Sequence, residues 1–206
     1  ELPATFGNAT APTINIGSIS NKGVDLQLIY RDDWSNGLSF EGNLTLTSYK
    51  NEIVAVADGV DYFDFGGSRI GTFARNEVGY PMSSFYGYEV AGLFQSDGDA
   101  TASGQDGAEA GFFQYKDNDG TAGISDADRA HIGNPNPDYT YGLNLMLGYK
   151  QFELTAYFYG YQGGDIFNYT KWWTDFWPSF QGQKSTDLLN NSWTPTNTGA
   201  TVPKAS

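Results

Sequence analysis

Three observations predict an all-β fold of antiparallel strands for this chain of 206 residues. Apolar and polar residues alternate along four stretches, with the period of a strand that has one buried face. Short turn sequences separate these stretches in pairs, as in β-hairpins. Glycine occurs 26 times, and few segments show the three-to-four-residue apolar spacing of an amphipathic helix. The pattern fits a transmembrane β-barrel and a soluble β-sandwich, and both stay open at this point.

The first predicted hairpin joins residues 19–31 to residues 38–49. Val24, Leu26 and Leu28 fall on one face of the first strand, and polar residues fall between them. The second strand alternates in the same way. Asn36-Gly37 lies between the two strands and is a strong signal for a tight turn.

The second predicted hairpin joins residues 138–149 to residues 152–163. Leu143, Leu145 and Leu147 share one face of its first strand. Lys150 and Gln151 form the tight connection to the second strand.

Long connections, residues 50–137 and 164–206, follow the two hairpins, so short and long connections alternate. This alternation is typical of outer-membrane barrels, whose turns are short on one side of the membrane and long on the other. Aromatic residues also lie at strand ends, as in an interfacial girdle: Tyr30, Tyr139, Tyr141, Tyr149 and Phe152. In a soluble sandwich the same residues would belong to the core.

Composition narrows the function classes. The formal net charge of −13 argues against nucleic-acid binding, which needs clustered Lys and Arg. Without cysteine the chain has no disulfide and no thiolate metal site. No apolar run approaches the roughly 20 residues of a transmembrane helix, which argues against a helical membrane protein.

Residues 117–128 form an acidic loop with the donor spacing of a calcium-binding loop. Oxygen donors occur at the first, third, fifth, ninth and twelfth positions of this stretch, as is usual for such loops. The predicted metal ligands are Asp117, Asp119, Thr121, Gly123 and Asp128. Thr at the fifth position removes a charge, and Asp at the twelfth reaches less far than the usual Glu. A structural calcium ion and a solvated acidic turn are therefore alternatives, and no other cofactor is expected.

Aromatic residues gather beyond the second hairpin, at Trp172, Trp173 and Trp177. Tryptophan rings on a loop could stack on the faces of sugar rings, so these three residues are the candidate ligand-binding residues. They could instead pack against neighbouring loops or a partner protein.

No catalytic residue is predicted. The chain has many carboxylates, but no motif of a serine hydrolase, zinc protease or phosphate-binding loop is present. We therefore expect a protein that is not an enzyme.

The segment 115–142 resembles a hallmark stretch of the SusC/RagA-type TonB-dependent outer-membrane transporters. The matching residues are Tyr115-Lys116-Asp117, Ile124, Asp128-Arg129, residues 132–137 and residues 139–142. Three further stretches resemble the family in the same order: residues 15–25, residues 79–88 with 92–95, and residues 160–168.

This resemblance implies that residues 1–206 are part of a transmembrane antiparallel β-barrel of about 22 strands with long extracellular loops. The four predicted strands would lie in the barrel wall, and residues 50–137 and 164–206 would be extracellular. Four strands cannot close a barrel, which needs at least about eight. The chain is accordingly expected to be a fragment from the C-terminal half of its parent, without the plug domain.

The resemblance also implies function and partners. The parent would import a nutrient across the bacterial outer membrane, an oligosaccharide or, as the less favoured cargo, a peptide. A SusD-like surface lipoprotein and the TonB complex would be its partners, the latter through the absent N-terminal part, and lipid would surround the barrel. The alternative from a different class is a secreted carbohydrate-binding β-sandwich, in which Leu143, Leu145 and Leu147 would be buried.

Overall fold

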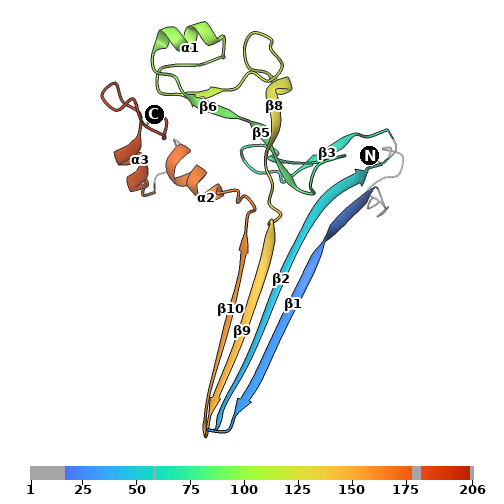
Figure 1. The fold of residues 1–206 in the computed structure, drawn as a ribbon. Helices are drawn as coiled ribbons and strands as arrows, with labels where there is room; N and C mark the ends of the chain where they lie inside the picture. The colour runs from blue at the N-terminus through green and yellow to red at the C-terminus, as the bar shows by residue number, and fades with distance from the viewer. Residues whose placement is uncertain (1–16, 58, 178–181, 205–206) are drawn as a thin grey trace, which may run out of the picture. The chain divides into compact units, whose positions relative to one another are not determined.

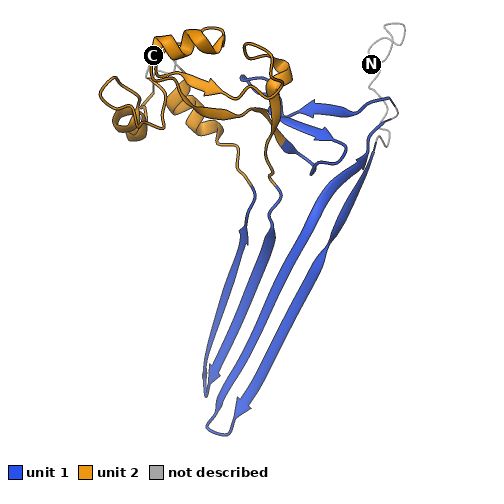
Figure 2. Ribbon diagram, turned by 45° about the horizontal axis from the view of Figure 1, so that its top comes forward, with its two compact units in different colours: residues 1–84, 136–164 blue, residues 85–135, 165–206 orange. Residues whose placement is uncertain are grey.

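The computed structural model describes residues 17–57, 59–177 and 182–204. The chain divides into two compact units (Figure 2), which are described separately below. Unit 1 comprises residues 1–84 and 136–164, and unit 2 comprises residues 85–135 and 165–206. Within the described ranges, no helix is both long and apolar enough to cross a membrane.

Unit 1 is dominated by a sheet of four long antiparallel strands, here called the long sheet (Figure 1). Its strands are β1 (Ser18–Trp34), β2 (Leu38–Ala55), β9 (Tyr139–Tyr149) and β10 (Phe152–Gln162). They lie in the order β1-β2-β9-β10, so the two hairpins are joined by pairing of β2 with β9. β1 and β10 are the outermost strands.

The two hairpin turns lie together at one end of the long sheet. Gly37 has the positive φ of 83° that its turn requires, and its amide donates to the carbonyl of Trp34 at 3.0 Å. Lys150 also has a positive φ, 56°. Its amide donates to the carbonyl of Gly37 at 3.1 Å, which connects the two turns.

The register of the long sheet separates an apolar face from a polar face. One cross-strand row of the apolar face contains Leu28, Leu44, Leu143 and Phe158. The neighbouring row on the polar face contains Ile29, Asn43, Asn144 and Tyr157. Alternation along each strand repeats this division from row to row, because successive side chains point to opposite faces.

No described part of unit 1 covers the apolar face. Leu147 is 40% exposed, Phe158 55% and Leu154 64%. Leu143 and Leu145 are half-buried and not fully buried. A β-sandwich would bury these leucines beneath a second sheet, so the sandwich alternative is not supported.

Strand β2 is longer than predicted, because the strand expected over residues 38–49 continues to Ala55. Asn51 Nδ2 donates to Asn21 Oδ1 at 2.7 Å on β1. Ile53 exchanges backbone hydrogen bonds with Gly79 and Tyr80, each at 2.9 Å, and its side chain is buried. These partners are distant in sequence, so local alternation could not reveal the extension.

Two short strands complete unit 1, and they lie in the segment predicted as a long loop. β3 (Tyr62–Phe65) pairs with β4 (Ala74–Glu77) in antiparallel fashion. Arg75 links them through two hydrogen bonds to Asp64, at 2.7 and 3.0 Å. Its guanidinium also lies 3.5 Å from the ring centroid of Tyr62.

Unit 2 contains short strands and helical turns. β5 (Ser84–Tyr88), whose first residue is counted with unit 1, pairs with β8 (Arg129–Gly133), and β6 (Val90–Leu93) pairs with β7 (Phe113–Tyr115). Helix α1 (Asp97–Ser103) is capped by the preceding Ser96, whose side chain accepts from the amide of Asp99. The other elements are the 3-10 turn η2 (Asp126–Asp128), α2 (Tyr169–Lys171), the π-helical turn η3 (Trp172–Phe176) and α3 (Thr186–Asn191).

A small core in unit 2 forms around Phe94 and Trp193, which are 1% and 6% exposed. The indole Nε1 of Trp193 donates to Gln95 Oε1 at 3.0 Å, so its polar atom is satisfied. Gly111 lies against the indole so closely that a Cβ would approach ring carbon Cε3 to 2.4 Å. Only glycine fits at this position without displacing the ring.

Candidate functional site

The acidic loop in unit 2 brings together three of its five predicted metal ligands. One carboxylate oxygen from each of Asp117, Asp119 and Asp128 lies within 4.8 Å of the other two. Gly123 adopts a φ of 94°, which lets the chain reverse here. Thr121 points its hydroxyl at the carboxylate of Asp119, to which it donates at 2.7 Å.

The buried carboxylate of Asp128 stabilises the acidic loop by accepting hydrogen bonds from its backbone. It is fully buried, and its Oδ1 accepts from the amides of Asn118 and Asp119 at 2.8 and 3.3 Å. Its Oδ2 accepts from the amide of Ser125 at 2.8 Å, which forms a capping box around η2. The hydrogen bond from Ser125 lowers the pKa of Asp128; burial opposes this, and the amides of Asn118 and Asp119 reinforce it.

The donor set fits a calcium ion in part. The close approach of three carboxylates is the arrangement that a hard divalent cation stabilises. However, both oxygens of Asp128 already accept from backbone amides, and Asp117 and Asp119 each accept one or more loop amides. The loop is thus closed by its own hydrogen bonds, and the predicted calcium ion stays a prediction.

The three candidate tryptophans form a compact group with Tyr169, here called the tryptophan cluster. The rings of Tyr169 and Trp172 stack at 5.3 Å between centroids with an interplanar angle of 4°. Trp172 lies 5.0 Å from Trp173 and 4.8 Å from Trp177. All three indoles are half-buried, and their faces are partly occupied by one another. Packing is therefore their evident role, and direct contact with a ligand stays a prediction.

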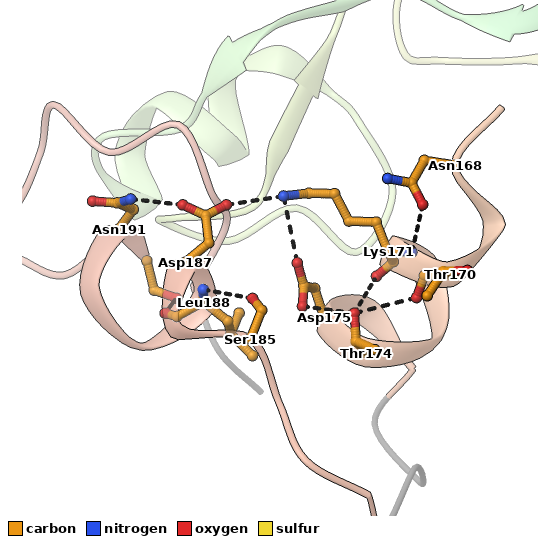
Figure 3. A network of polar contacts seen from close by, with 10 residues as sticks. Asn168, Thr170, Lys171, Thr174, Asp175, Ser185, Asp187, Leu188 and Asn191 are labelled. Carbon is orange, nitrogen blue, oxygen red and sulfur yellow. Dashed lines mark hydrogen bonds and ion pairs between the residues drawn. The ribbon is translucent and has the colours of Figure 1, made fainter. Parts of the chain in front are cut away.

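A polar network fixes the helical turns that carry this cluster (Figure 3). Lys171 Nζ lies 2.9 Å from Asp187 Oδ2 on α3 and 3.4 Å from Asp175 Oδ2 on η3. Asn191 Nδ2 donates to the other oxygen of Asp187 at 2.6 Å. The ammonium group of Lys171 thus links η3 and α3, which are separated in sequence.

The pKa values in this network move in the directions expected for ion pairs. The hydrogen bond to Asp187 is the main cause of a raised pKa of Lys171. Hydrogen bonds from Asn191 and then Lys171 lower the pKa of Asp187. Burial acts to raise the pKa of Asp175, but hydrogen bonds from Ser185, Thr174 and Lys171 outweigh it, so the net shift is downward.

Unit 2 also contains a pocket of about 320 Å³ that sequence patterns did not predict. Rings of Phe113, Tyr115 and Phe176 line it, together with Leu188 of α3. Its residues come from three separate stretches of the chain, so no local motif marks it. Burial raises the pKa of the Tyr115 phenol. The pocket is here called the unit 2 pocket.

Comparison with known proteins places the whole chain in one family. It is 36% identical over 214 residues to TonB-dependent receptor P3 of Formosa agariphila, an alignment that covers 97% of this chain. The chain belongs to the TonB-dependent receptors. TonB-dependent receptor P26 of the same organism is 29% identical over 194 residues. The chain spans about a fifth of the length of these relatives, 20% and 19%. No family model matches the sequence.

Solved structures show that this receptor segment has the fold of part of the RagAB peptide transporter. The TM-score is 0.73 with 24% sequence identity, over 99% of this chain and 22% of the RagAB chain. The RagAB peptide importer in its open-open state gives the same TM-score and identity. The motifs predicted a resemblance to the SusC/RagA-type TonB-dependent transporters, and this prediction is confirmed. The predicted antiparallel, mostly β architecture is also confirmed. The names of the relatives, receptors and a transporter, agree with the expectation that the receptor segment is not an enzyme.

Proposed function

We propose that this receptor segment forms part of the wall of a transmembrane barrel of about 22 strands in the bacterial outer membrane. The observation that carries the proposal is the long sheet, which has one uncovered apolar face and one polar face. Lipid would cover the apolar face, and the polar face would line the interior. The outermost strands β1 and β10 would pair with neighbouring strands of the full-length receptor, since four strands cannot close a barrel.

The spacing of the aromatic residues supports this arrangement. Tyr139 and Tyr149 lie at opposite ends of β9, ten residues apart on the same face. At about 3.3 Å per residue and a strand tilt of about 40°, they are separated by roughly 25 Å along the membrane normal. That distance matches the height of about 25 Å for the apolar band of an outer-membrane barrel, which aromatic girdles flank.

The proposed activity of the full-length receptor is import of a nutrient, driven by the TonB complex. We propose an oligosaccharide as the cargo, because unit 2 carries the tryptophan cluster and the aromatic rings of the unit 2 pocket, and such rings can stack on sugars. A peptide is the second candidate, supported by the fold shared with the RagAB peptide transporter. A SusD-like surface lipoprotein is the proposed partner on the extracellular side, and no enzymatic step is needed.

Uptake by cells tests this function. A strain that lacks the full-length receptor is complemented with the wild-type gene, and uptake of fluorescent neutral oligosaccharides and of fluorescent peptides is compared. We expect oligosaccharide uptake to depend on the receptor and to stop when the proton-motive force is collapsed. If only peptide uptake depended on the receptor, the cargo would be a peptide and not an oligosaccharide. If uptake of both classes were independent of the receptor, the proposed import function would be refuted.

Association with the lipoprotein is tested separately. The full-length receptor carrying an affinity tag is extracted in detergent, and co-purifying proteins are identified by mass spectrometry. We expect a lipid-modified protein in a constant ratio to the receptor. A receptor that purifies alone under mild extraction would contradict the proposed partner.

A further inference from the structure

The polar face of the long sheet carries three tyrosines in line on the outermost strand β10 (Figure 1). Tyr157, Tyr159 and Tyr161 are alternate residues of this strand, so their side chains share one face. That face is the polar one, because Tyr157 lies opposite Asn144. The three rings are 72%, 89% and 60% exposed, and they are here called the tyrosine stripe. In the proposed barrel this face lines the interior, where polar side chains are usual, so a line of exposed rings departs from the common pattern.

The sheet leaves space beside the tyrosine stripe. Gly142 of β9 lies opposite Tyr159 and has no side chain to cover its ring. A Cβ at Gly142 would approach Thr45 Oγ1 to 2.8 Å, so a side chain at this position would have to displace Thr45. A depression of about 170 Å³ adjoins the stripe on the same face, and Tyr157 and Asn144 are among the residues that line it. A ligand can therefore approach the rings from the side of β9.

Hydrogen-bonding groups lie next to these rings. Within the part of the chain that the structure describes, neither the three phenol hydroxyls nor the side-chain amide of Asn144 makes a hydrogen bond. The hydroxyl of Thr45, in contrast, donates to the carbonyl of Gly142 at 3.4 Å. An amide group and a phenol hydroxyl can each donate and accept. These groups can thus bond to the hydroxyls of a ligand that lies across the rings.

The surface around the tyrosine stripe is uncharged. No side chain carries a charge in residues 155–161 of β10 or in residues 140–146 of β9. Carboxylates flank the stripe at both ends. Glu153 lies toward the hairpin turn, and the carboxylate of Asp138 lies against Gly163 beyond the other end. An anionic ligand would be repelled at both ends, because like charges raise the free energy of binding.

These properties together fit a neutral oligosaccharide. Glu41 of β2 lines the depression, but it pairs with Arg31 at 2.8 Å and so brings no uncompensated charge. A sugar ring has a face of C–H groups that can lie on a phenol ring. It also has an edge of hydroxyl groups, which both donate and accept and match the amide of Asn144.

We propose that the tyrosine stripe is a track on the inner wall of the barrel, on which a neutral oligosaccharide stacks during import. The proposal rests on the proposed function, which supplies the cargo and assigns the polar face to the interior. β10 ends at Gln162, before the connection proposed to be extracellular, so the track would lead inward from Tyr161 to Tyr157. Neighbouring tyrosines are two residues apart, about 7 Å along the strand, so a sugar can move from ring to ring in short steps.

Substitutions on the two faces of β10 test the proposal. Tyr159→Ala removes the most exposed ring of the stripe, and a triple alanine variant removes all three rings. Tyr159→Phe keeps the ring and removes only the hydroxyl. Phe158→Ala is a matched control, because Phe158 is the preceding residue, is 55% exposed and lies on the apolar face. Asn144→Ala removes the amide beside the stripe and leaves the rings in place.

The measurement is the initial rate of uptake by cells at limiting probe concentration, divided by the amount of folded full-length receptor in the outer membrane. The probes are radiolabelled malto-, cello-, xylo-, manno- and laminari-oligosaccharides, with oligogalacturonate as an anionic probe and oligoalanine as a peptide probe. For the neutral series that is imported, we expect Tyr159→Ala and Asn144→Ala each to lower uptake by about threefold to tenfold. The triple variant should lower it by about tenfold or more, and Tyr159→Phe and Phe158→Ala should import like the wild type.

Each other outcome overturns the proposal in a distinguishable way. If a neutral oligosaccharide is imported equally by the wild type and the triple variant, the tyrosine stripe is not a track and the proposed function stands. If the receptor imports no neutral oligosaccharide, the proposed cargo fails together with the track. If the triple variant loses only uptake of oligogalacturonate or oligoalanine, the stripe serves an anionic sugar or a peptide. If the alanine variants reduce only the amount of folded receptor, the rings pack against another part of the receptor and do not bind cargo.

Discussion

Arginine substitutions at neighbouring positions of β9 test whether the apolar face of the long sheet contacts lipid. Leu143 lies on the apolar face, between Leu44 of β2 and Phe158 of β10. Asn144 is the next residue and points to the polar face, opposite Asn43 and Tyr157. The variants Leu143→Arg and Asn144→Arg therefore place the same charge on opposite sides of one strand.

The expected loss of stability follows from the depth of the substituted residue in the membrane. Leu143 is four residues from Tyr139 and six from Tyr149, which mark the two proposed interfaces. At about 3.3 Å per residue along the strand, it lies within a few ångströms of the midplane of the apolar band. An arginine facing lipid at the midplane costs about 2–4 kcal/mol. An arginine on the water-lined polar face should change stability by no more than about 0.5 kcal/mol.

The assay is urea unfolding of the full-length receptor in phosphatidylcholine vesicles, followed by tryptophan fluorescence. The amount of folded receptor in cell outer membranes is a second measurement for a variant that does not refold. We expect a lower urea midpoint and less folded protein for Leu143→Arg only. Equal effects at the two positions, or a larger loss for Asn144→Arg, would refute the assignment of the apolar face to lipid.

Four further predictions concern unit 2. Calcium supplied at millimolar concentration should co-purify with the receptor in a one-to-one ratio and be lost in Asp119→Ala; wild-type protein without calcium by elemental analysis would exclude the ion. Because the pKa of Asp128 is lowered on folding, its contribution to loop stability should be present above its unfolded pKa and lost as pH falls through its folded value, measured as lower protection of the amides of residues 117–128 relative to their intrinsic exchange rates at each pH. The variant Lys171→Met leaves the buried carboxylate of Asp175 without its cation and should cost about 1 kcal/mol, since Lys171 is partly exposed and water screens the pair; unchanged amide exchange in α3 would contradict this. Trp172→Ala removes three ring contacts worth about 0.5–1.5 kcal/mol each and should loosen the tryptophan cluster in near-ultraviolet circular dichroism, an effect that Trp172→Phe should largely avoid.

The parts of the fold that could be predicted from sequence are those determined by local pattern. Strand alternation and the turn at Asn36-Gly37 depend on residues close together in the chain, and the structure has strands and a turn there. The end of β2 could not be predicted, because Ile53 pairs with Gly79 and Tyr80 across a long segment. Local alternation ends at residue 49, but the strand continues because it stays paired with β1 as far as Ala55 and Ile53 also bonds to Gly79 and Tyr80.

In the candidate sites, too, the features set by a contiguous stretch of sequence could be predicted, and those set by distant residues could not. The acidic loop is a contiguous stretch, so its spacing alone indicated that Asp117, Asp119 and Asp128 would converge. The sequence did not indicate that Asp128 would be buried and occupied by amides, since this depends on the path of the loop backbone. The unit 2 pocket was not predicted at all, because its walls come from residues 105–115, from Asp175, Phe176, Lys184 and Leu188, and from residues 203–204.

Sequence alternation alone does not distinguish a barrel from a sandwich. Alternation places Leu28, Leu44, Leu143 and Phe158 on one face in either architecture, because both have a polar face opposite an apolar one. The architectures differ only in what covers the apolar face, a second sheet or lipid. Leu154 and Phe158 remain more than half exposed, although a protein of this size could bury such side chains. An uncovered apolar face that extends along four strands would be an aggregation hazard in water, which supports the proposal that membrane hydrocarbon covers it.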